Sequence, residues 1–393
     1  MTPSDPTLQI QPWQDFIAAY EADWLSLWQR TGASPDLSPM WMQALVVAHS
    51  VDTPQLHVVS AHGADGCLLM VWPFQTHTRQ VARVPVVEIA PVQNIFCMHA
   101  GLLSCLEAEP SVALLMQALR RWTQPWHWLE LADLEAGSPL HRAWQATSKA
   151  GRHGLRSQPG ERPPYLTHQG SLDDLIAAGS KKFRKKVRGL LRDVRDPKTA
   201  RVQWYRQPQE LAEYQPLALS IEARSWKHAA GSAITSRDWE AAFYAQLIQR
   251  LGPTGHLMGV VLFLDGQPVA HSLELRHGTR TFGLKSSFDH TLAKRSPGHM
   301  LLVHVLDTCF AAGCQEYDFL GKDEDYKLEW TDSVRRHLGL RVYNDSFSSQ
   351  ALAMMDRLRK ATRLSTYPLP TNGMVVAMTV MESTLESGAR LAM

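Results

Sequence analysis

The stretch Thr281–Trp330, TFGLKSSFDHTLAKRSPGHMLLVHVLDTCFAAGCQEYDFLGKDEDYKLEW, decides the fold because it joins clear strand and helix signals. Thr281–Ser287 predicts a strand that ends in a polar loop. Ser296 and Pro297 are residue types favoured at a helix N-cap and at the first helical position, so we expect a helix to begin there. Glu316–Leu320 predicts a second strand after this helix.

The start of this helix is a candidate anion site. The N–H groups of Gly298, His299 and Met300 have no acceptor within the first helical turn, so they can point at a phosphate. Gly298 would let a phosphate approach the backbone closely, and Arg295 adds positive charge at the same end. The alternative is an ordinary strand–helix connection with a normal cap, because a short glycine motif is weak evidence.

Length and composition set the frame for this site. The chain has 393 residues, enough for two domains with their own cores. Its content of 45% hydrophobic and 20% charged residues is ordinary for a globular protein. The formal net charge is only +2, so a basic surface that binds a polyanion must be local.

Cysteine usage and hydropathy indicate the compartment. The five cysteines are an odd number without metal-ligand spacing, which favours a reducing compartment without a disulfide framework. The first residues, MTPSDPTLQI, lack the basic and apolar regions of a signal peptide. No apolar run approaches the roughly 20 residues that span a bilayer. We therefore expect a cytoplasmic protein.

The order of predicted elements indicates two similar domains followed by a tail. Residues 1–165 give helices, three strands, a helix, a strand and a helix, which is an α+β order. After the irregular stretch Gly160–Gly170, residues 166–345 repeat that order, with a hairpin turn at Asp265-Gly266 and a helix at Glu324–Leu338 before a last strand. Residues 346–393 form a helical tail. The repetition concerns element order and not residue identity.

The most charged segment is a predicted helix from Lys181 to Arg195. Its apolar residues form a narrow stripe. Cations in the first turn oppose the helix dipole, so helix stability does not explain them. A polyanion would: coenzyme phosphates, an acyl carrier protein, RNA or an anionic lipid surface. The alternative is a solvated basic face. The residues assigned to this basic partner helix are Lys181, Lys182, Arg184, Lys185, Lys186 and Arg188.

Four groups of residues together resemble a known family. They are the basic helix after Ser180, Glu222 with Trp226-Lys227, the Ser296-Pro297-Gly298 helix start, and Asp318-Phe-Leu-Gly321 with Tyr326-Lys327. This set is similar to the CelD/BcsL-type acetyltransferase family of the GNAT superfamily, which is related to the Fem peptidyl transferases. The resemblance is clearest over residues 180–344. It implies tandem GNAT-like domains, each a mixed, mostly antiparallel sheet flanked by helices, with the second domain holding the acyl donor.

The resemblance also implies a donor site for acyl-CoA. GNAT proteins carry a phosphate loop of the form Q/R-x-x-G-x-G/A. This sequence keeps Arg295 and Gly298 of that pattern, with His299 between, and has Met300 at the last small position. The pantetheine arm would lie along the strand that ends at Ser286 and Ser287.

The catalytic residues that this arrangement suggests are an acid and a lysine. Asp318, at the end of a buried strand, could take the amine proton, and Glu222 is the rival base. Lys327 could stabilise the oxyanion, because the Fem relatives have a matching lysine. For each of the three, the alternative is a structural ion pair, cap or exposed position. The residues expected to shape the acceptor pocket are Trp226, Lys227 and Tyr326.

Three functions follow from these observations. The first is an N-acyltransferase that moves an acyl group from acyl-CoA to an amine of an amino sugar, amino acid or secondary-metabolite precursor. The second keeps the fold and takes the acyl group from an acyl carrier protein or an aminoacyl-tRNA. The third is a non-catalytic scaffold that binds an anionic partner. The sequence shows no metal-ligand cluster, so we expect no metal cofactor.

Overall fold

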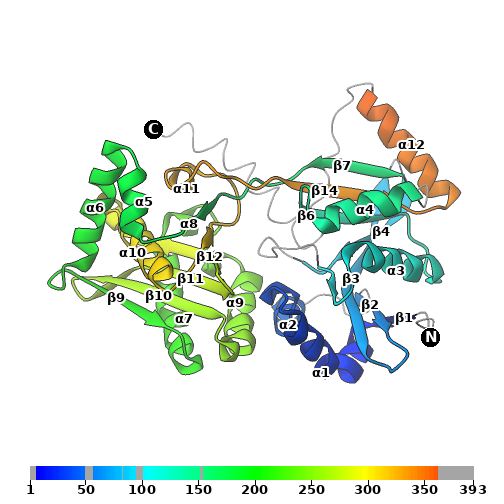
Figure 1. The fold of residues 1–393 in the computed structure, drawn as a ribbon, viewed down its shortest axis with the longest axis horizontal. Coiled ribbons are helices and arrows are strands. Elements are labelled where there is room, and N and C mark those ends of the chain that lie inside the picture. Colours follow the sequence, from blue (N-terminus) through cyan, green and yellow to red (C-terminus); the bar gives the residue numbers. More distant parts are fainter. Residues whose placement is uncertain (1–5, 49–55, 82, 94–100, 151–153, 362–393) are drawn as a thin grey trace. The chain divides into compact units, whose positions relative to one another are not determined.

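The computed structural model describes residues 6–48, 56–81, 83–93, 101–150 and 154–361, and its contacts divide the chain into two units (Figure 1). Unit 1 comprises Met1–Leu45, Ser50–Glu161 and Arg336–Met393. Unit 2 comprises Val46–His49 and Arg162–Arg335. Each unit packs helices on a mixed sheet, so the expected α+β class is confirmed.

Unit 1 is built on a sheet with the strand order β1-β2-β3-β4-β6-β14-β7, in which β5 also pairs with β3. Its strands are β1 (Thr7–Pro12), β2 (Leu56–His62), β3 (Leu68–Val81), β4 (Val84–Pro91), β5 (Leu103–Ser104), β6 (Trp128–Glu135), β7 (Leu155–Pro159) and β14 (His337–Tyr343). Its helices are α1 (Trp13–Thr31), α2 (Pro39–Ala48), α3 (Ala108–Arg121), α4 (Pro139–Ala150) and α12 (Phe347–Ala361).

Unit 2 is built on a sheet with the strand order β8-β13-β12-β11-β10-β9. Its strands are β8 (Tyr165–Thr167), β9 (Ala200–Tyr205), β10 (Leu257–Leu264), β11 (Gln267–His277), β12 (Arg280–Phe288) and β13 (Glu316–Asp318). Its helices are α5 (Leu172–Ala178), α6 (Lys181–Arg195), α7 (Pro208–Ala223), α8 (Trp226–Ala229), α9 (Asp238–Leu251), α10 (Pro297–Ala311) and α11 (Asp325–Leu328).

The two sheets repeat one pattern of strand order and direction. In unit 1, β1, β2, β3 and β4 pair antiparallel in sequence, and β4 then pairs parallel with β6. In unit 2, β9, β10, β11 and β12 pair antiparallel in the same way, and β12 pairs parallel with β13. In both units a helix, α3 or α10, connects the parallel strands. The two sheets therefore show the repetition of element order that the sequence predicts.

The last strand departs from the prediction. We expected it to complete the second domain, but β14 pairs with β6 and β7 and so belongs to the sheet of unit 1. The predicted helix Glu324–Leu338 is also wrong: only Asp325–Leu328 is helical, and β14 begins at His337. The reason is tertiary, because the strand pairing of β14 satisfies backbone groups that a longer helix would have used. In the predicted helical tail, α12 ends at Ala361, and residues 362–393 lie outside the described residues.

The core of unit 2 explains why the decisive stretch folds as it does. Helix α10 is apolar on most sides, because α6 and the sheet both contact it. Helix α6 buries Val187, Leu190, Leu191 and Val194 on one face, as its sequence predicts, and the Ser180 hydroxyl accepts the N–H of Phe183. Within the described residues, no helix is both long and apolar enough to cross a membrane.

Candidate active site

The site lies where the parallel strands of unit 2 separate. Strands β12 and β13 pair only from Arg280 to Phe282, and β12 then continues to Phe288. A bulge on β12 lies at the same point: Gly283 pairs with Glu274 of β11, and Leu284 has no partner residue there. Beyond Phe282 the edge of β12 therefore has no β13 partner in the described chain, which leaves backbone groups for a ligand.

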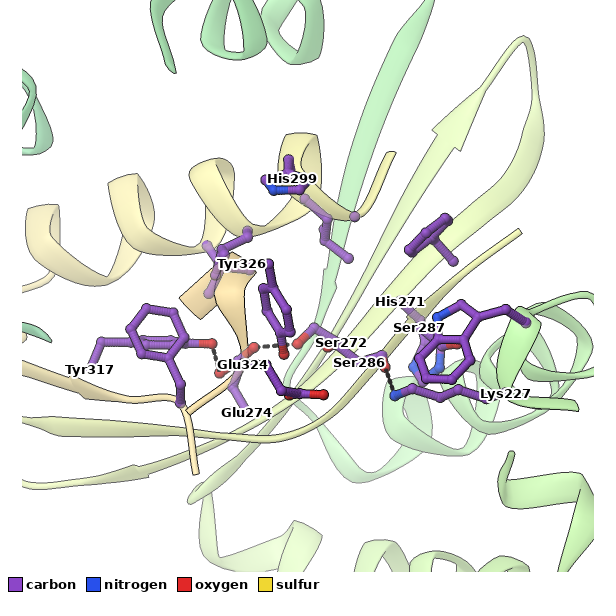
Figure 2. Close-up of a pocket in the computed structure, with 18 residues that line it drawn as sticks. Lys227, His271, Ser272, Glu274, Ser286, Ser287, His299, Tyr317, Glu324 and Tyr326 are labelled. Carbon is purple, nitrogen blue, oxygen red and sulfur yellow. Dashed lines mark hydrogen bonds between the residues drawn. The ribbon is translucent and has the colours of Figure 1, made fainter. Parts of the chain in front are cut away.

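A cavity of about 260 Å³ opens at this separation (Figure 2). It is bounded by β11, β12, β13, the start of α10, α8 and the segment that leads into α11. Its lining residues are Trp226, Lys227, His271, Ser272, Glu274, Gly283, Ser286, Ser287, Phe288, Gly298, His299, Leu301, Leu302, Val305, Tyr317, Phe319, Glu324 and Tyr326. The cavity therefore combines an apolar wall from α10 with a small group of polar side chains, as small-molecule sites do.

Glu274 is the central acid of this cavity, and sequence reasoning missed it. Its side chain is buried and accepts hydrogen bonds from the hydroxyls of Ser272 and Tyr317 (Figure 2). Burial raises its pKa to about 7, although both hydroxyl donors act to lower the pKa. A carboxyl with this pKa can accept and release a proton at neutral pH. The available signal was the position of this acid, which lies between Leu273 and Leu275 and is the one acidic residue of strand β11.

Tyr317 reaches Glu274 because Gly283 has no side chain. A Cβ atom at Gly283 would lie 2.8 Å from the Tyr317 hydroxyl and 3.8 Å from a Glu274 carboxylate oxygen. Any larger residue on β12 would push the tyrosine away. The bulge, the glycine and the tyrosine therefore act together to position one carboxyl.

Lys227 and two aromatic side chains, the residues predicted to shape the acceptor pocket, all line this cavity. The Lys227 ammonium donates a hydrogen bond to the backbone carbonyl of Ser286, at 2.7 Å (Figure 2). Burial and the neighbouring cation of Lys285 lower the pKa of Lys227 to about 8. Trp226 and Tyr326 line the cavity and remain 46% and 39% exposed, which is unusual for side chains of this size.

The start of α10 contributes to the cavity in part as predicted. Gly298 and His299 line it, and burial and Lys186 lower the pKa of His299. Ser296 is not a side-chain cap: its backbone is left-handed, with φ 54°, and its hydroxyl makes no capping bond. The Met300 N–H donates to the Ser296 carbonyl, and its side chain is buried in the core, so the expected role of Met300 in donor binding is wrong.

Two further features of the expected phosphate loop need correction. Arg295 forms an ion pair with Asp265 of the β10–β11 turn, at 2.8 Å, and is not a lining residue. A Cβ atom at Gly298 would lie 3.0 Å from the Phe288 ring, so close packing against β12 already favours a glycine there. The absence of a side chain at Gly298 is thus explained without a phosphate.

Glu222, which the sequence offers as the rival base to Asp318, has a structural role instead. Both of its oxygens are used: one accepts from the His271 ring and the other from the Ile234 N–H. Burial alone would raise its pKa, but the His271 hydrogen bond and the nearby lysines lower it to about 2. A carboxylate held in this way is a poor proton acceptor at neutral pH, and it does not line the cavity.

Asp318 and Lys327 are likewise held away from the cavity. Asp318 pairs with Arg335 at 3.0 Å and accepts the Leu320 N–H with its other oxygen. The Lys327 ammonium donates to the carbonyls of Leu320 and Lys322 and pairs with Glu324. These contacts fix the turn after β13. Asp318 and Lys327, which the sequence predicts as base and oxyanion lysine, therefore stabilise this turn.

Ser286 and Ser287 line the cavity from the open part of β12, as expected. The Ser287 side chain is 6% exposed, and its hydroxyl has no hydrogen-bond partner in the described structure. A buried hydroxyl without a partner costs about 1–3 kcal/mol. This hydroxyl is available to a polar ligand that lies along β12.

The basic helix α6 presents two kinds of cation. Lys186 pairs with Glu329 at 2.5 Å, and Arg184 donates to the Gly179 carbonyl at 2.9 Å. The others are exposed and have no ion pair in the described part of the chain: Lys181, Lys182, Lys185 and Arg188. No group of three or more potential metal ligands occurs within the described residues.

Several known proteins share the fold of this chain. Residues 181–328 match the family model of an acetyltransferase (GNAT) domain. FemX is similar in structure with a TM-score of 0.54 at 11% identity, over 85% of this chain and 98% of FemX. A conserved protein of unknown function from Bacteroides thetaiotaomicron has a TM-score of 0.54 at 12% identity, over 86% and 100% of the two chains.

The C-terminal domain of a putative lysylphosphatidylglycerol synthetase from Agrobacterium fabrum is also similar, with a TM-score of 0.51 at 12% identity, over 87% and 96%. No curated protein matches the chain in sequence. Identities this low show the fold alone. The chain therefore has a GNAT-type acyltransferase fold. The residues of the cavity all lie within residues 181–328, the part of the chain that matches the GNAT acetyltransferase model.

Proposed function

We propose that the protein is an N-acyltransferase that moves an acyl group from acyl-CoA to an amine of a small molecule. The proposed acceptor is an amino sugar, an amino acid or a secondary-metabolite precursor. One observation carries the proposal: a buried carboxyl with a pKa near neutrality, Glu274, lies in the cavity where β12 and β13 separate.

The chemistry assigns one role to each part of this site. An amine attacks a thioester carbonyl only in its neutral form, so a group must remove its proton. Glu274 is that base, held by Ser272 and Tyr317. The unpaired backbone groups on the edge of β12 would hold the donor arm, and the Gly298–His299 helix start would face its phosphates.

Calorimetry of CoA and acetyl-CoA binding tests the donor site. Gly298→Glu places a negative side chain at the start of α10 and should abolish micromolar binding. The matched control is Gly189→Glu on α6, where a Cβ atom has nothing within 4 Å. Circular dichroism would confirm that both variants fold, since Gly298 lies close to Phe288. Equal binding by Gly298→Glu and wild type would remove the donor from this helix start.

A second candidate is the same fold with a macromolecular donor, an acyl carrier protein or an aminoacyl-tRNA. The four exposed cations of α6 without ion pairs motivate it, because a CoA molecule needs fewer charges. Charge reversal of Lys181, Lys185 and Arg188 should abolish transfer from a macromolecular donor and leave transfer from acetyl-CoA unchanged. The opposite result would exclude this candidate.

The third candidate is a non-catalytic scaffold that binds an anionic partner through α6. It predicts salt-sensitive binding to anionic vesicles or RNA, without acyl transfer from any thioester. A clear acyl-transfer signal with any amine would rule it out. Thiol release from acetyl-CoA in the presence of a panel of amines therefore separates this candidate from the first.

A further inference from the structure

We propose that Lys227 is a self-acylation site: in the absence of an acceptor amine, the bound thioester acylates the ε-amine of this lysine. The inference rests on the proposed function, because it requires an acyl thioester in the cavity. It adds an intramolecular reaction and a modified residue to the proposed transfer between two small molecules.

The position of the amine is the first argument. Lys227 comes from α8 and lines the same cavity as Glu274 and Gly283, where β12 and β13 separate. Its Nζ atom is fixed 2.7 Å from the carbonyl oxygen of Ser286, on the part of β12 that has no β13 partner (Figure 2). A thioester whose arm follows this open edge would therefore lie beside the amine.

The hydrogen bond leaves the amine able to react. A neutral lysine amine keeps two N–H groups and gains a lone pair. One N–H can continue to donate to the Ser286 carbonyl while the lone pair faces the cavity. The contact that holds Lys227 in place thus restricts the search for a reactive geometry, which is the main source of acceleration in reactions between neighbouring groups.

The surroundings favour the neutral amine at mildly alkaline pH. Burial and Lys285 lower the pKa of Lys227 to about 8, and three acids oppose this effect. The charged or titratable groups that face Lys227 from neighbouring elements are Lys285, Glu222, Glu240, His271 and Glu324. Glu222 and Glu240 are engaged by His271 and Lys285, respectively, and Glu324 pairs with Lys327, so none of these acids forms a direct ion pair with Lys227.

The reaction balances without a further reagent. The Lys227 nitrogen attacks the thioester carbonyl, a C–N bond forms and the C–S bond breaks. The sulfur leaves with the bonding pair, and the proton lost by nitrogen passes to the thiolate or to water. The product is an amide, which is stable, so the modified lysine is not a transfer intermediate. Its remaining N–H can still donate to Ser286, and the acyl group would occupy the acceptor space.

Mass spectrometry of the full chain tests this site. The wild-type protein is incubated with acetyl-CoA at pH 8 without an acceptor, and acetylation is followed at each lysine by peptide mapping. We expect Lys227 to be acetylated at least about 10-fold faster than Lys198, an exposed lysine in the turn before β9. Excess CoA should slow acetylation at Lys227 and leave Lys198 unchanged. The rate at Lys227 should fall on going to pH 6.5, since fewer molecules carry a neutral amine.

Two variants complete the experiment. Lys227→Arg keeps the cation and should eliminate the rapid acetylation, whereas Lys198→Arg should leave it unchanged. Acetylation of Lys227 at the rate of Lys198, or insensitivity to CoA, would overturn the inference. If amines are acylated while Lys227 stays unmodified, only the self-acylation is wrong. If calorimetry detects no acetyl-CoA binding, the proposed function and the inference both fail.

Discussion

The two units share a strand order but differ in the residue at the point where their parallel strands separate. In unit 2 the residue after the last parallel pair of β12 is Gly283, which lies opposite Glu274. In unit 1 the residue after the last parallel pair of β4 is Ala90, which lies opposite Gln75. A buried glutamine thus stands where unit 2 has a titratable acid, and an amide cannot act as a base at neutral pH.

The helices that follow these strands, α10 and α3, also differ in the charge of their first turn. Helix α10 of unit 2 begins with Pro297 and Gly298, has no acid in its first turn, and borders the cavity. Helix α3 of unit 1 has Glu107 at its N-cap and Glu109 in its first turn. Acids at a helix start satisfy the dipole and repel a phosphate. The strand pattern is therefore the same in both units, whereas the residues at the strand separation differ, and the proposed base and phosphate site both belong to unit 2.

Replacing Glu274 of unit 2 by the glutamine that unit 1 has at the matching position should have the largest effect on catalysis. Glu274→Gln keeps the shape and removes the base, so we expect kcat for amine acylation to fall by about 10²–10⁴-fold. The affinity for CoA should change little, because the proposed phosphate site is the start of α10 and does not include Glu274. Steady-state thiol release and calorimetry measure the two quantities.

The matched control is Glu130→Gln in unit 1. Glu130 is also buried, and burial raises its pKa to about 7, but it pairs with Arg341 and is not a lining residue of the cavity. The kcat of the folded variant should equal that of wild type. If both substitutions reduced kcat equally, the loss would reflect general stability, and the contrast between the units would have no catalytic meaning.

The pH dependence should be the second largest effect. Only the deprotonated form of Glu274 accepts a proton, and its pKa is about 7. Between pH 6 and pH 8, kcat/KM should therefore rise roughly tenfold, and Glu274→Gln should lose this rise. The free energy of unfolding should change in the opposite direction. Because the pKa of Glu274 in the folded protein exceeds its ordinary value of 4.5, wild type should lose stability relative to Glu274→Gln as the pH rises from about 4.5 to 7. A pH profile unchanged by the substitution would assign the base elsewhere.

The sequence predicted the fold better than the site, and particular residues show why. The hairpin at Asp265-Gly266 and the apolar stripe of α6 are local signals, and both are confirmed. The strand–helix–strand order of residues 281–320 follows from hydrophobic periodicity, and it is confirmed as β12, α10 and β13. These features depend on neighbours in the chain, which the sequence displays directly.

The site depends on contacts between distant residues. Asp318 and Lys327 have the right types at the right strand end, but Arg335 and the carbonyls of the following turn engage them. The role of Glu274 could not be predicted from the sequence, because its partner Tyr317 lies 43 residues away in the chain and contacts it only in the folded protein. Spacing along the chain cannot distinguish an acid that is satisfied by an arginine from one that is desolvated beside a cavity, because that difference is set by tertiary packing.

Removing one donor to Glu274 should give a smaller effect that sharpens the contrast. In Tyr317→Phe the carboxylate loses a hydrogen bond that lowers its pKa, so the midpoint of the pH profile should move up by about 0.5–1 unit. At pH 7, kcat should fall several-fold and recover at pH 8. Gly283→Ala should act in the same direction, because its Cβ atom would displace the Tyr317 hydroxyl. A downward shift of the midpoint in Tyr317→Phe would contradict the arrangement.

The smallest effect concerns Ser287, whose hydroxyl is buried without a partner in the described structure. In the free protein, Ser287→Ala removes an unsatisfied polar group and should leave the free energy of unfolding unchanged or raise it by about 1 kcal/mol. If the hydroxyl binds the donor arm, the same variant should weaken CoA binding by about 3- to 10-fold, which corresponds to one hydrogen bond of roughly 1 kcal/mol. Denaturant unfolding and calorimetry give the two values.

The opposite signs make this the most specific test of the donor arm. Ser220 of α7 provides the matched control, because its hydroxyl donates to the Leu217 carbonyl within the helix and it is not a lining residue. Ser220→Ala should leave CoA binding unchanged. If Ser287→Ala lowered stability and left CoA binding unchanged, the hydroxyl would serve the fold of β12. The open edge of β12 would then lack the polar contact that distinguishes it as a ligand site.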